Sequence, residues 1–97
     1  MIRHSVILKL KSGISPEEKQ AFFDAVDKLA SIPDVQKFEV LKQISSKNTF
    51  EYGISMEFDT QEQYDSYSNH PEHVAFVQHF WLKNVEDFLE IDYSVLN

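Results

Sequence analysis

Hydrophobic and polar residues alternate along four stretches of this chain, and a period of two predicts β-strands. The stretches are residues 2–11, 35–44, 50–58 and 88–95, of which 35–44 is the least regular. In the first stretch, one face carries Ile2, His4, Val6, Leu8 and Leu10. The sequence therefore predicts a sheet with an apolar face that also holds a histidine.

Apolar residues three and four positions apart predict helices between these strands. The first helix begins at Ser15 and Pro16, where a serine cap and a helix-starting proline precede Glu18 in a capping-box position. A second helical region begins after Thr60 and is broken at Asn69-His70-Pro71. A further helix is expected from there to about Asn84.

The element order β-α-β-β-α-β is typical of an α+β, ferredoxin-like fold with an antiparallel sheet. We expect the first and last strands to be adjacent in this sheet and to run parallel to each other. Helices should cover one sheet face, while the other face is apolar and carries Ile7, Leu89, Ile91, Tyr93 and Val95. An apolar sheet face of this size usually marks an interface, so we expect a homodimer formed through it.

Composition narrows the classes of function. Residues 1–97 are expected to form a single domain, and the formal net charge of -7 argues against nucleic-acid binding. The absence of cysteine excludes disulfides and thiolate metal sites. No apolar run approaches the roughly 20 residues that span a bilayer, and no signal-peptide pattern is present. We therefore expect a cytoplasmic protein that does not contact membranes.

The stretch His70-Pro71-Glu72-His73-Val74-Ala75-Phe76 carries the first candidate chemistry. Helical spacing places His73 on the buried stripe with Phe76 and Val77, whereas His79 falls off this stripe and should be exposed. A histidine that points inward near a helix N-terminus is either a hydrogen-bonded core residue or a working acid/base. Both interpretations stay open at this point.

Other polar residues are expected to converge on the same place. His4, Asp92 and Glu90 all fall on the helix-facing side of the sheet, towards His73. Polar groups gathered in one cavity are costly unless they pair with each other or with water. A metal site built from His4, His70, His73 and the carboxylates is an alternative interpretation of this cluster.

Three stretches together resemble the stress-responsive A/B barrel (Dabb) domain, a branch of the dimeric α+β barrel proteins. They are Ile2-Arg3-His4 at the start of the first strand, the stretch from His70 to Phe76, and the pair Asp92-Tyr93. The resemblance covers essentially the whole chain. It implies a dimer whose two sheets pack face to face, with one small-molecule cavity per subunit between sheet and helices.

A characterised plant member of that family is an enzyme that cyclises a linear polyketide by aldol condensation without a cofactor or metal. The resemblance implies that His73 is the acid/base residue, with Asp92 as its hydrogen-bond partner. It places the active-site tyrosine at Tyr67 and the first-strand histidine at His4. The expected substrate contacts are Val6, Leu8, Phe22, Phe23, Ile54, Met56, Phe88 and Glu90.

This chain departs from that pattern at two positions. Tyr52 stands about where the plant enzyme has a further pocket histidine, and Glu90 puts a carboxylate in an expected apolar wall. A long alkyl tail is therefore disfavoured as part of the ligand. If Glu90 points into the cavity, a polar or cationic ligand is favoured; if it points outward, an apolar ligand is favoured.

Several functions remain open from the sequence. The first is a cofactor-free lyase or cyclase in which His73 removes a proton beside a carbonyl group. The second is a non-catalytic, stress-responsive dimer that binds a small molecule, with His73 and Asp92 forming a structural hydrogen bond. A cofactor-free monooxygenase of the same superfamily is the third.

Overall fold

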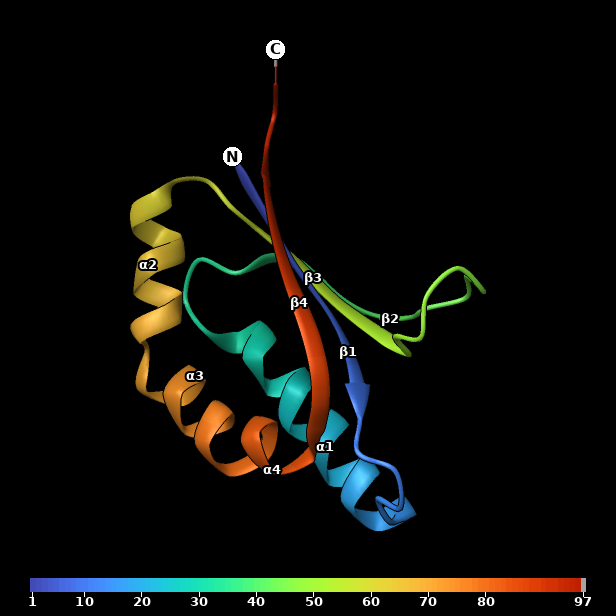
Figure 1. Ribbon diagram of the computed structural model, residues 1–97. Helices are drawn as coiled ribbons and strands as arrows, with labels where there is room; N and C mark the ends of the chain where they lie inside the picture. The colour runs from blue at the N-terminus through green and yellow to red at the C-terminus, as the bar shows by residue number, and fades with distance from the viewer. Residues whose placement is uncertain (97) are drawn as a thin grey trace.

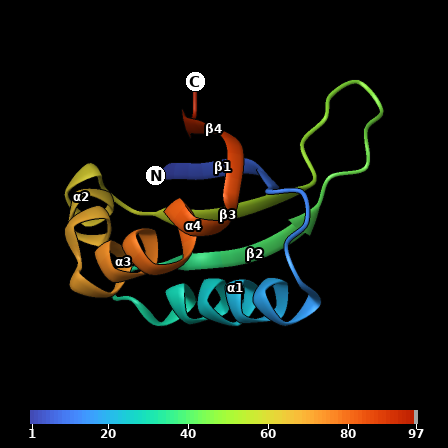
Figure 2. The ribbon, with the colours of Figure 1, turned by 60° about the horizontal axis from the view of Figure 1, so that its bottom comes forward.

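The structure is a computed structural model that describes residues 1–96, with a four-stranded sheet and all helices on one side of it (Figures 1 and 2). The elements in chain order are β1 (Ile2–Leu10), α1 (Pro16–Lys28), η1 (Leu29–Ser31), β2 (Gln36–Lys42), β3 (Tyr52–Phe58), α2 (Gln61–Asn69), α3 (Pro71–Phe76), η2 (Val77–Trp81), α4 (Leu82–Asn84) and β4 (Val85–Ser94). The ferredoxin-like α+β prediction is confirmed.

The strands are arranged in the order β2-β3-β1-β4, and each neighbouring pair is antiparallel. The expected parallel pairing of the first and last strands is therefore wrong. The chain enters β4 beside the end of β1, where the Lys11 N–H donates to the Asn84 carbonyl at 2.8 Å. A strand that starts where its neighbour ends must run in the opposite direction.

The helix starts follow the capping residues in the sequence. Ser15 Oγ accepts a hydrogen bond from the Glu18 N–H at 3.1 Å, and Thr60 Oγ1 accepts one from the Gln63 N–H at 3.2 Å. Each side chain satisfies one of the donors that a helix N-terminus leaves unpaired. In the described part of the chain, no helix combines the length and the apolar character needed to cross a membrane.

The break in the second helical region lies at His70, as predicted. Its ring Nδ1 accepts the Glu72 N–H at 3.1 Å, and Pro71 is the first residue of α3. The helix then changes to a π-helical turn, η2, before ending in α4. Val77, Phe80 and Trp81 of this turn pack against the core.

The core lies between the helices and one face of the sheet, here called the helix-side face. Period-two alternation places Val6, Leu8, Ile54, Met56 and Phe58 on it, and all five are buried. Phe22 and Val26 of α1 are fully buried against them. Burying side chains of this size stabilises the fold by about 1.5–3 kcal/mol each.

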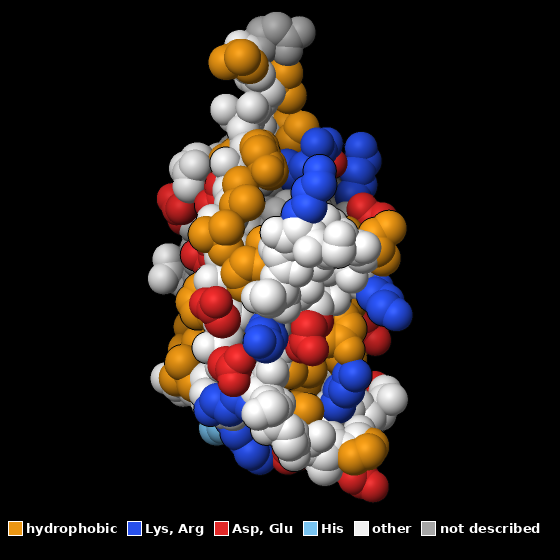
Figure 3. Space-filling view, turned by 45° about the vertical axis from the view of Figure 1, so that its right-hand side comes forward, with side chains coloured by type: hydrophobic (Ala, Val, Ile, Leu, Met, Phe, Trp, Pro, Cys, Tyr) orange, Lys and Arg blue, Asp and Glu red, His pale blue; other side chains and the backbone are white. Residues whose placement is uncertain are grey.

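The opposite face, here called the outer face, has no helix over it. On it Leu89, Tyr93 and Val95 are 49%, 53% and 61% exposed, and Ile7 and Ile91 are partly exposed. Figure 3 shows hydrophobic side chains in a column that descends from the C-terminal end, beside charged side chains. The apolar outer face expected from the alternation is present in the single chain.

Truncation of Leu8 tests the placement of the core. Leu8 is fully buried, so Leu8→Ala should lower the free energy of unfolding by about 2–5 kcal/mol. Leu82, which is 65% exposed, supplies the matched control, and Leu82→Ala should change stability by less than about 0.5 kcal/mol. Urea unfolding followed by circular dichroism measures both values. Equal losses for the two variants would contradict this core.

Candidate functional site

A pocket of about 260 Å³ lies between the helix-side face of β1, β3 and β4 and the helical segment from α3 to α4. Its apolar wall consists of Val6, Leu29, Ile54, Met56, Phe76, Val77, Trp81, Leu82 and Phe88. Four residues with polar side chains complete the wall: His4, Tyr67, His73 and Glu90. A mostly apolar pocket with a few polar groups is the usual form of a small-molecule site.

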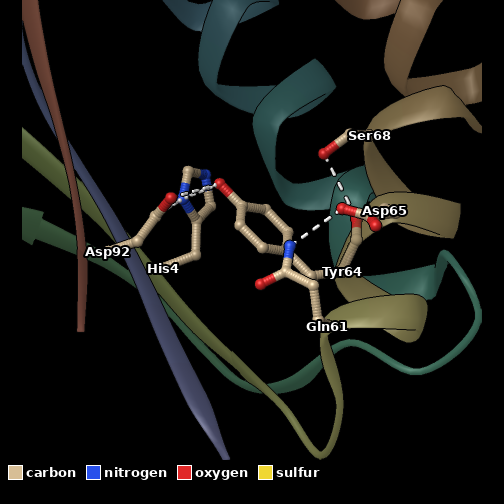
Figure 4. Close-up of polar contacts among 6 residues, drawn as sticks. All are labelled: His4, Gln61, Tyr64, Asp65, Ser68 and Asp92. Atoms are coloured by element: carbon tan, nitrogen blue, oxygen red, sulfur yellow. Dashed lines mark hydrogen bonds and ion pairs between the residues drawn. The ribbon is translucent and has the colours of Figure 1, made fainter. Parts of the chain in front are cut away.

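His4 is buried at the base of this pocket and is held by two residues from other elements. Its Nδ1 lies 2.6 Å from Asp92 Oδ1 on β4 and 2.9 Å from the Tyr64 hydroxyl on α2 (Figure 4). Tyr64 donates its hydroxyl proton to Asp92 Oδ2 at 2.9 Å. Because Asp92 accepts at both oxygens, Nδ1 of His4 carries a proton, and Nε2 is the ring nitrogen that this hydrogen-bond group leaves unused.

The expected hydrogen bond between His73 and Asp92 is wrong. Asp92 lies directly opposite His4 in the β1–β4 ladder, and such neighbours have Cβ atoms only about 4.5–5.5 Å apart. His73 instead donates from Nδ1 to the Ser68 carbonyl at 2.9 Å. That carbonyl belongs to the last turn of α2, where helices leave carbonyl groups without partners.

The surroundings of His73 favour a neutral ring. Burial lowers the pKa of His73 below its ordinary value, and positive charge on His4 acts in the same direction. The hydrogen bond to Ser68 and the charge of Glu90 raise the pKa, but less than burial lowers it. With Nδ1 donating to a carbonyl, neutral His73 carries its free lone pair on Nε2. The ring lines the pocket and is therefore a candidate proton acceptor.

Tyr67 packs its ring against His73, with 4.7 Å between the ring centroids, and is itself buried. Burial, followed by the negative charge of Glu90, raises the pKa of Tyr67 well above its ordinary value. Within residues 1–96, every fully buried side-chain polar atom has a hydrogen-bond partner, whereas the Tyr67 hydroxyl forms no hydrogen bond and belongs to a residue that lines the pocket. The hydroxyl therefore reaches the open pocket as a protonated donor.

The structure brings His4, Tyr67, His73 and Glu90 together, with Asp92 behind His4. Of the expected substrate contacts, Val6, Ile54, Met56, Phe88 and Glu90 lie on the pocket wall.

Leu8, Phe22 and Phe23 are placed elsewhere, which corrects the expectation that they contact the ligand. Leu8 and Phe22 are fully buried in the core, and Phe23 packs edge-on against Tyr52 at 4.8 Å between ring centroids. Phe22 and Phe23 belong to the face of α1 that packs against the core.

The sequence pattern does not single out two residues of this site, Tyr64 and Trp81. Tyr64 lies three residues before Tyr67 on the same helix, a spacing that is typical of packing. The signal that identifies it is its place in α2 opposite His4 and Asp92, which needs the relative position of three elements. His79 is exposed, as predicted. In residues 1–96, no group of three or more histidine and carboxylate side chains is arranged to hold a metal ion.

Comparison with known proteins agrees with the resemblance seen in the sequence. The sequence model of the family described as "Stress responsive A/B Barrel Domain" matches residues 2–95. A crystal structure of a Dabb family protein with a ferredoxin-like fold from Mesorhizobium loti is 46% identical, with a TM-score of 0.92 over 99% of this chain and 97% of that one.

Two further relatives bear on activity and assembly. Olivetolic acid cyclase from Cannabis sativa is 29% identical over 100 residues, which cover 96% of this chain and 95% of the enzyme. A dimeric protein with a ferredoxin-like fold from Bacteroides fragilis is 26% identical, with a TM-score of 0.75 over 97% of this chain and 95% of that one.

The lowered pKa of His73 predicts a specific loss of stability in acid. Because the unfolded chain binds the His73 proton more tightly than the folded chain, stability depends on keeping the ring neutral. This contribution is intact above the unfolded pKa of about 6.5 and declines as the pH falls from there through the folded pKa. His73→Gln should therefore show a smaller decrease in Tm than wild type between about pH 7.5 and about pH 5.

The matched control is His79→Gln, which alters an exposed histidine in the same helical region and should keep the wild-type pH dependence. The quantity compared is the slope of Tm with pH, since either substitution can shift Tm itself. A slope for His73→Gln equal to that of wild type would contradict the placement of a neutral His73.

Proposed function

The chain belongs to the stress-responsive A/B barrel family, and on that premise we propose that it binds a small carbonyl compound and removes a proton beside the carbonyl. The observation that carries the proposal is the convergence of His73 and Tyr67 on one apolar pocket. A neutral imidazole and a protonated phenol are the base and the donor that enolate formation needs. The cyclase named among the relatives supports the same class of chemistry.

His73 is the proposed base. Its Nδ1 is occupied by the Ser68 carbonyl, so proton abstraction would fall to Nε2. A carbonyl acceptor holds the ring in one tautomer as a carboxylate would, without adding a negative charge. The depressed pKa keeps His73 neutral near pH 7, the state that accepts a proton. A positioned base of this kind typically contributes about 10²- to 10⁴-fold in rate.

Tyr67 and His4 are the proposed groups for the developing enolate oxygen. The raised pKa of Tyr67 keeps its hydroxyl protonated, so that it can donate to an oxyanion. His4 would contribute as the imidazolium, donating to the oxygen from Nε2, while Asp92 and Tyr64 fix the orientation of its ring through Nδ1. Asp92 therefore acts as a positioning residue for His4 and not, as the sequence implied, for His73.

Hydrogen exchange at carbon tests this proposal without knowledge of the natural substrate. We expect the protein in D₂O to exchange the α-protons of some members of a panel of small ketones and aldehydes, measured by proton NMR. His73→Ala should lose most of this exchange, by about 10²-fold or more, because the base is removed. Tyr67→Phe should lose less, since one of several hydrogen bonds to the enolate oxygen disappears.

His79→Ala is the matched control and should exchange protons at the wild-type rate, since His79 is exposed outside this pocket. Exchange that survives in full in His73→Ala would place the base elsewhere. If ligands bind and raise Tm but no panel member exchanges, the non-catalytic ligand-binding dimer becomes the better account of the pocket.

We further propose that two copies of the chain pair through their outer faces. Leu89, Tyr93 and Val95 leave an apolar column in contact with solvent on the single chain. Exposed apolar patches of this kind are rare on monomers because covering them is favourable. The dimeric relative from Bacteroides fragilis supports a dimer for this chain.

Ile91→Asp tests this interface. Ile91 lies on the outer face opposite Ser5, and a second copy would bury the new carboxylate without a partner. We expect wild type to be dimeric at micromolar concentration and Ile91→Asp to be monomeric or unfolded, as measured by light scattering and circular dichroism. Val74→Asp, on the exposed side of α3, should remain dimeric. A monomeric wild type would contradict the proposed dimer.

A further inference from the structure

Glu90 is a carboxylate on the pocket wall that forms no ion pair within residues 1–96. It lies opposite Val6 in the β1–β4 ladder, and directly opposed residues share a face, so Glu90 belongs to the helix-side face. Within residues 1–96 it takes part in none of the ion pairs or side-chain hydrogen bonds. Because Glu90 is also solvent-exposed, its carboxylate stands at the mouth of the pocket.

The walls near this carboxylate are aromatic. Trp81 and Phe88 meet edge to face with 5.4 Å between ring centroids, and Phe76 lies 6.2 Å from Trp81. Ring faces carry a partial negative charge that attracts cations, and tryptophan does so most strongly. A carboxylate beside such rings is the combination that recognises ammonium groups.

Ligands of other charge are disfavoured at this position. A neutral apolar ligand would take water away from Glu90 and leave the carboxylate without a partner, which costs free energy. An anionic ligand would meet Glu90 at the mouth and the Asp92 carboxylate behind His4. Like charges at such short separations repel one another.

We propose that this pocket selects a small cation, with Glu90 binding the ligand's ammonium group. Its volume of about 260 Å³ is below the roughly 300–1,000 Å³ of pockets for drug-sized molecules, so the ligand is small. The assignment of a carbonyl group rests on the proposed function. Together the two proposals give a substrate that is a small carbonyl compound with a protonated amine. Glu90 then determines specificity, while His73 performs the proton transfer.

Trp81 gives a direct measure of binding, because it is the single tryptophan of the sequence and lies in the pocket. Three probes of similar shape differ in charge: 2-phenylethylammonium, 2-phenylethanol and phenylacetate. Titrated into the wild-type protein and followed by Trp81 fluorescence, the ammonium probe should bind about tenfold more tightly than the alcohol. Phenylacetate should bind more weakly than either.

Glu90→Gln should remove this preference and bring the dissociation constants of the ammonium and alcohol probes to within about twofold. Glu86→Gln is the matched control: it removes the same charge from the same strand, but Glu86 pairs with Lys9 outside the pocket. The Glu86→Gln variant should keep the wild-type order of affinities for the three probes. Circular dichroism shows whether each variant is folded.

The inference is overturned if the alcohol or phenylacetate binds as tightly as the ammonium probe. It is also overturned if Glu90→Gln keeps the preference, or if the ammonium probe fails to bind at millimolar concentration. These outcomes are independent of hydrogen exchange. Cation binding that depends on Glu90, without any exchange, would reject the proposed catalysis and leave the ligand assignment standing.

Discussion

The hydrogen bond between His4 and Asp92 restricts how the helix-side face of the sheet can be arranged. His4 is 6% exposed among core residues, and a buried polar group without a partner costs about 1–3 kcal/mol. The partner is the residue directly across the ladder, so the bond also sets the register of β4 against β1. A shift by one residue would turn Asp92 and Glu90 to the outer face.

Because the side-chain period of a strand is two, this register decides the position of several site residues together. Asp92 opposite His4 requires Glu90 opposite Val6 and Phe88 opposite Leu8. The same register sends Leu89 and Ile91 to the outer face. The chemistry of the pocket and the apolar character of the proposed dimer interface are thus two consequences of one strand pairing.

Much of this arrangement is predictable from the sequence, because alternation reports directly which face a strand residue occupies. The faces of His4, Glu90 and Asp92 and the helix break at His70 all follow from local patterns. The direction and the boundaries of a strand are harder to predict from the sequence. The antiparallel course of β4 depends on where the chain returns, and β4 begins at Val85, three residues before the alternation becomes visible.

Hydrogen-bond partners are not predictable in the same way, because two side chains that face the same space can still lie too far apart to bond. Asp92 and His73 both point into the space between sheet and helices, yet Asp92 meets His4 and Tyr64 while His73 turns back to Ser68. Nor does hydrophobicity distinguish a ligand wall from a core. Phe22 packs where α1 lies close on the sheet, whereas the segment through the π turn leaves a gap that Trp81 lines.

Both pocket histidines form a hydrogen bond through Nδ1, and the protonation of His73 depends on the charges around it. His4 is held by a carboxylate and His73 by a backbone carbonyl, and charge on His4 opposes protonation of His73. A cation bound at Glu90 would act in the same sense, by offsetting the negative charge that raises the His73 pKa. Linkage is reciprocal, so a neutral His73 also favours the bound cation. Binding of the proposed cation at Glu90 would therefore promote the proton-accepting state of His73.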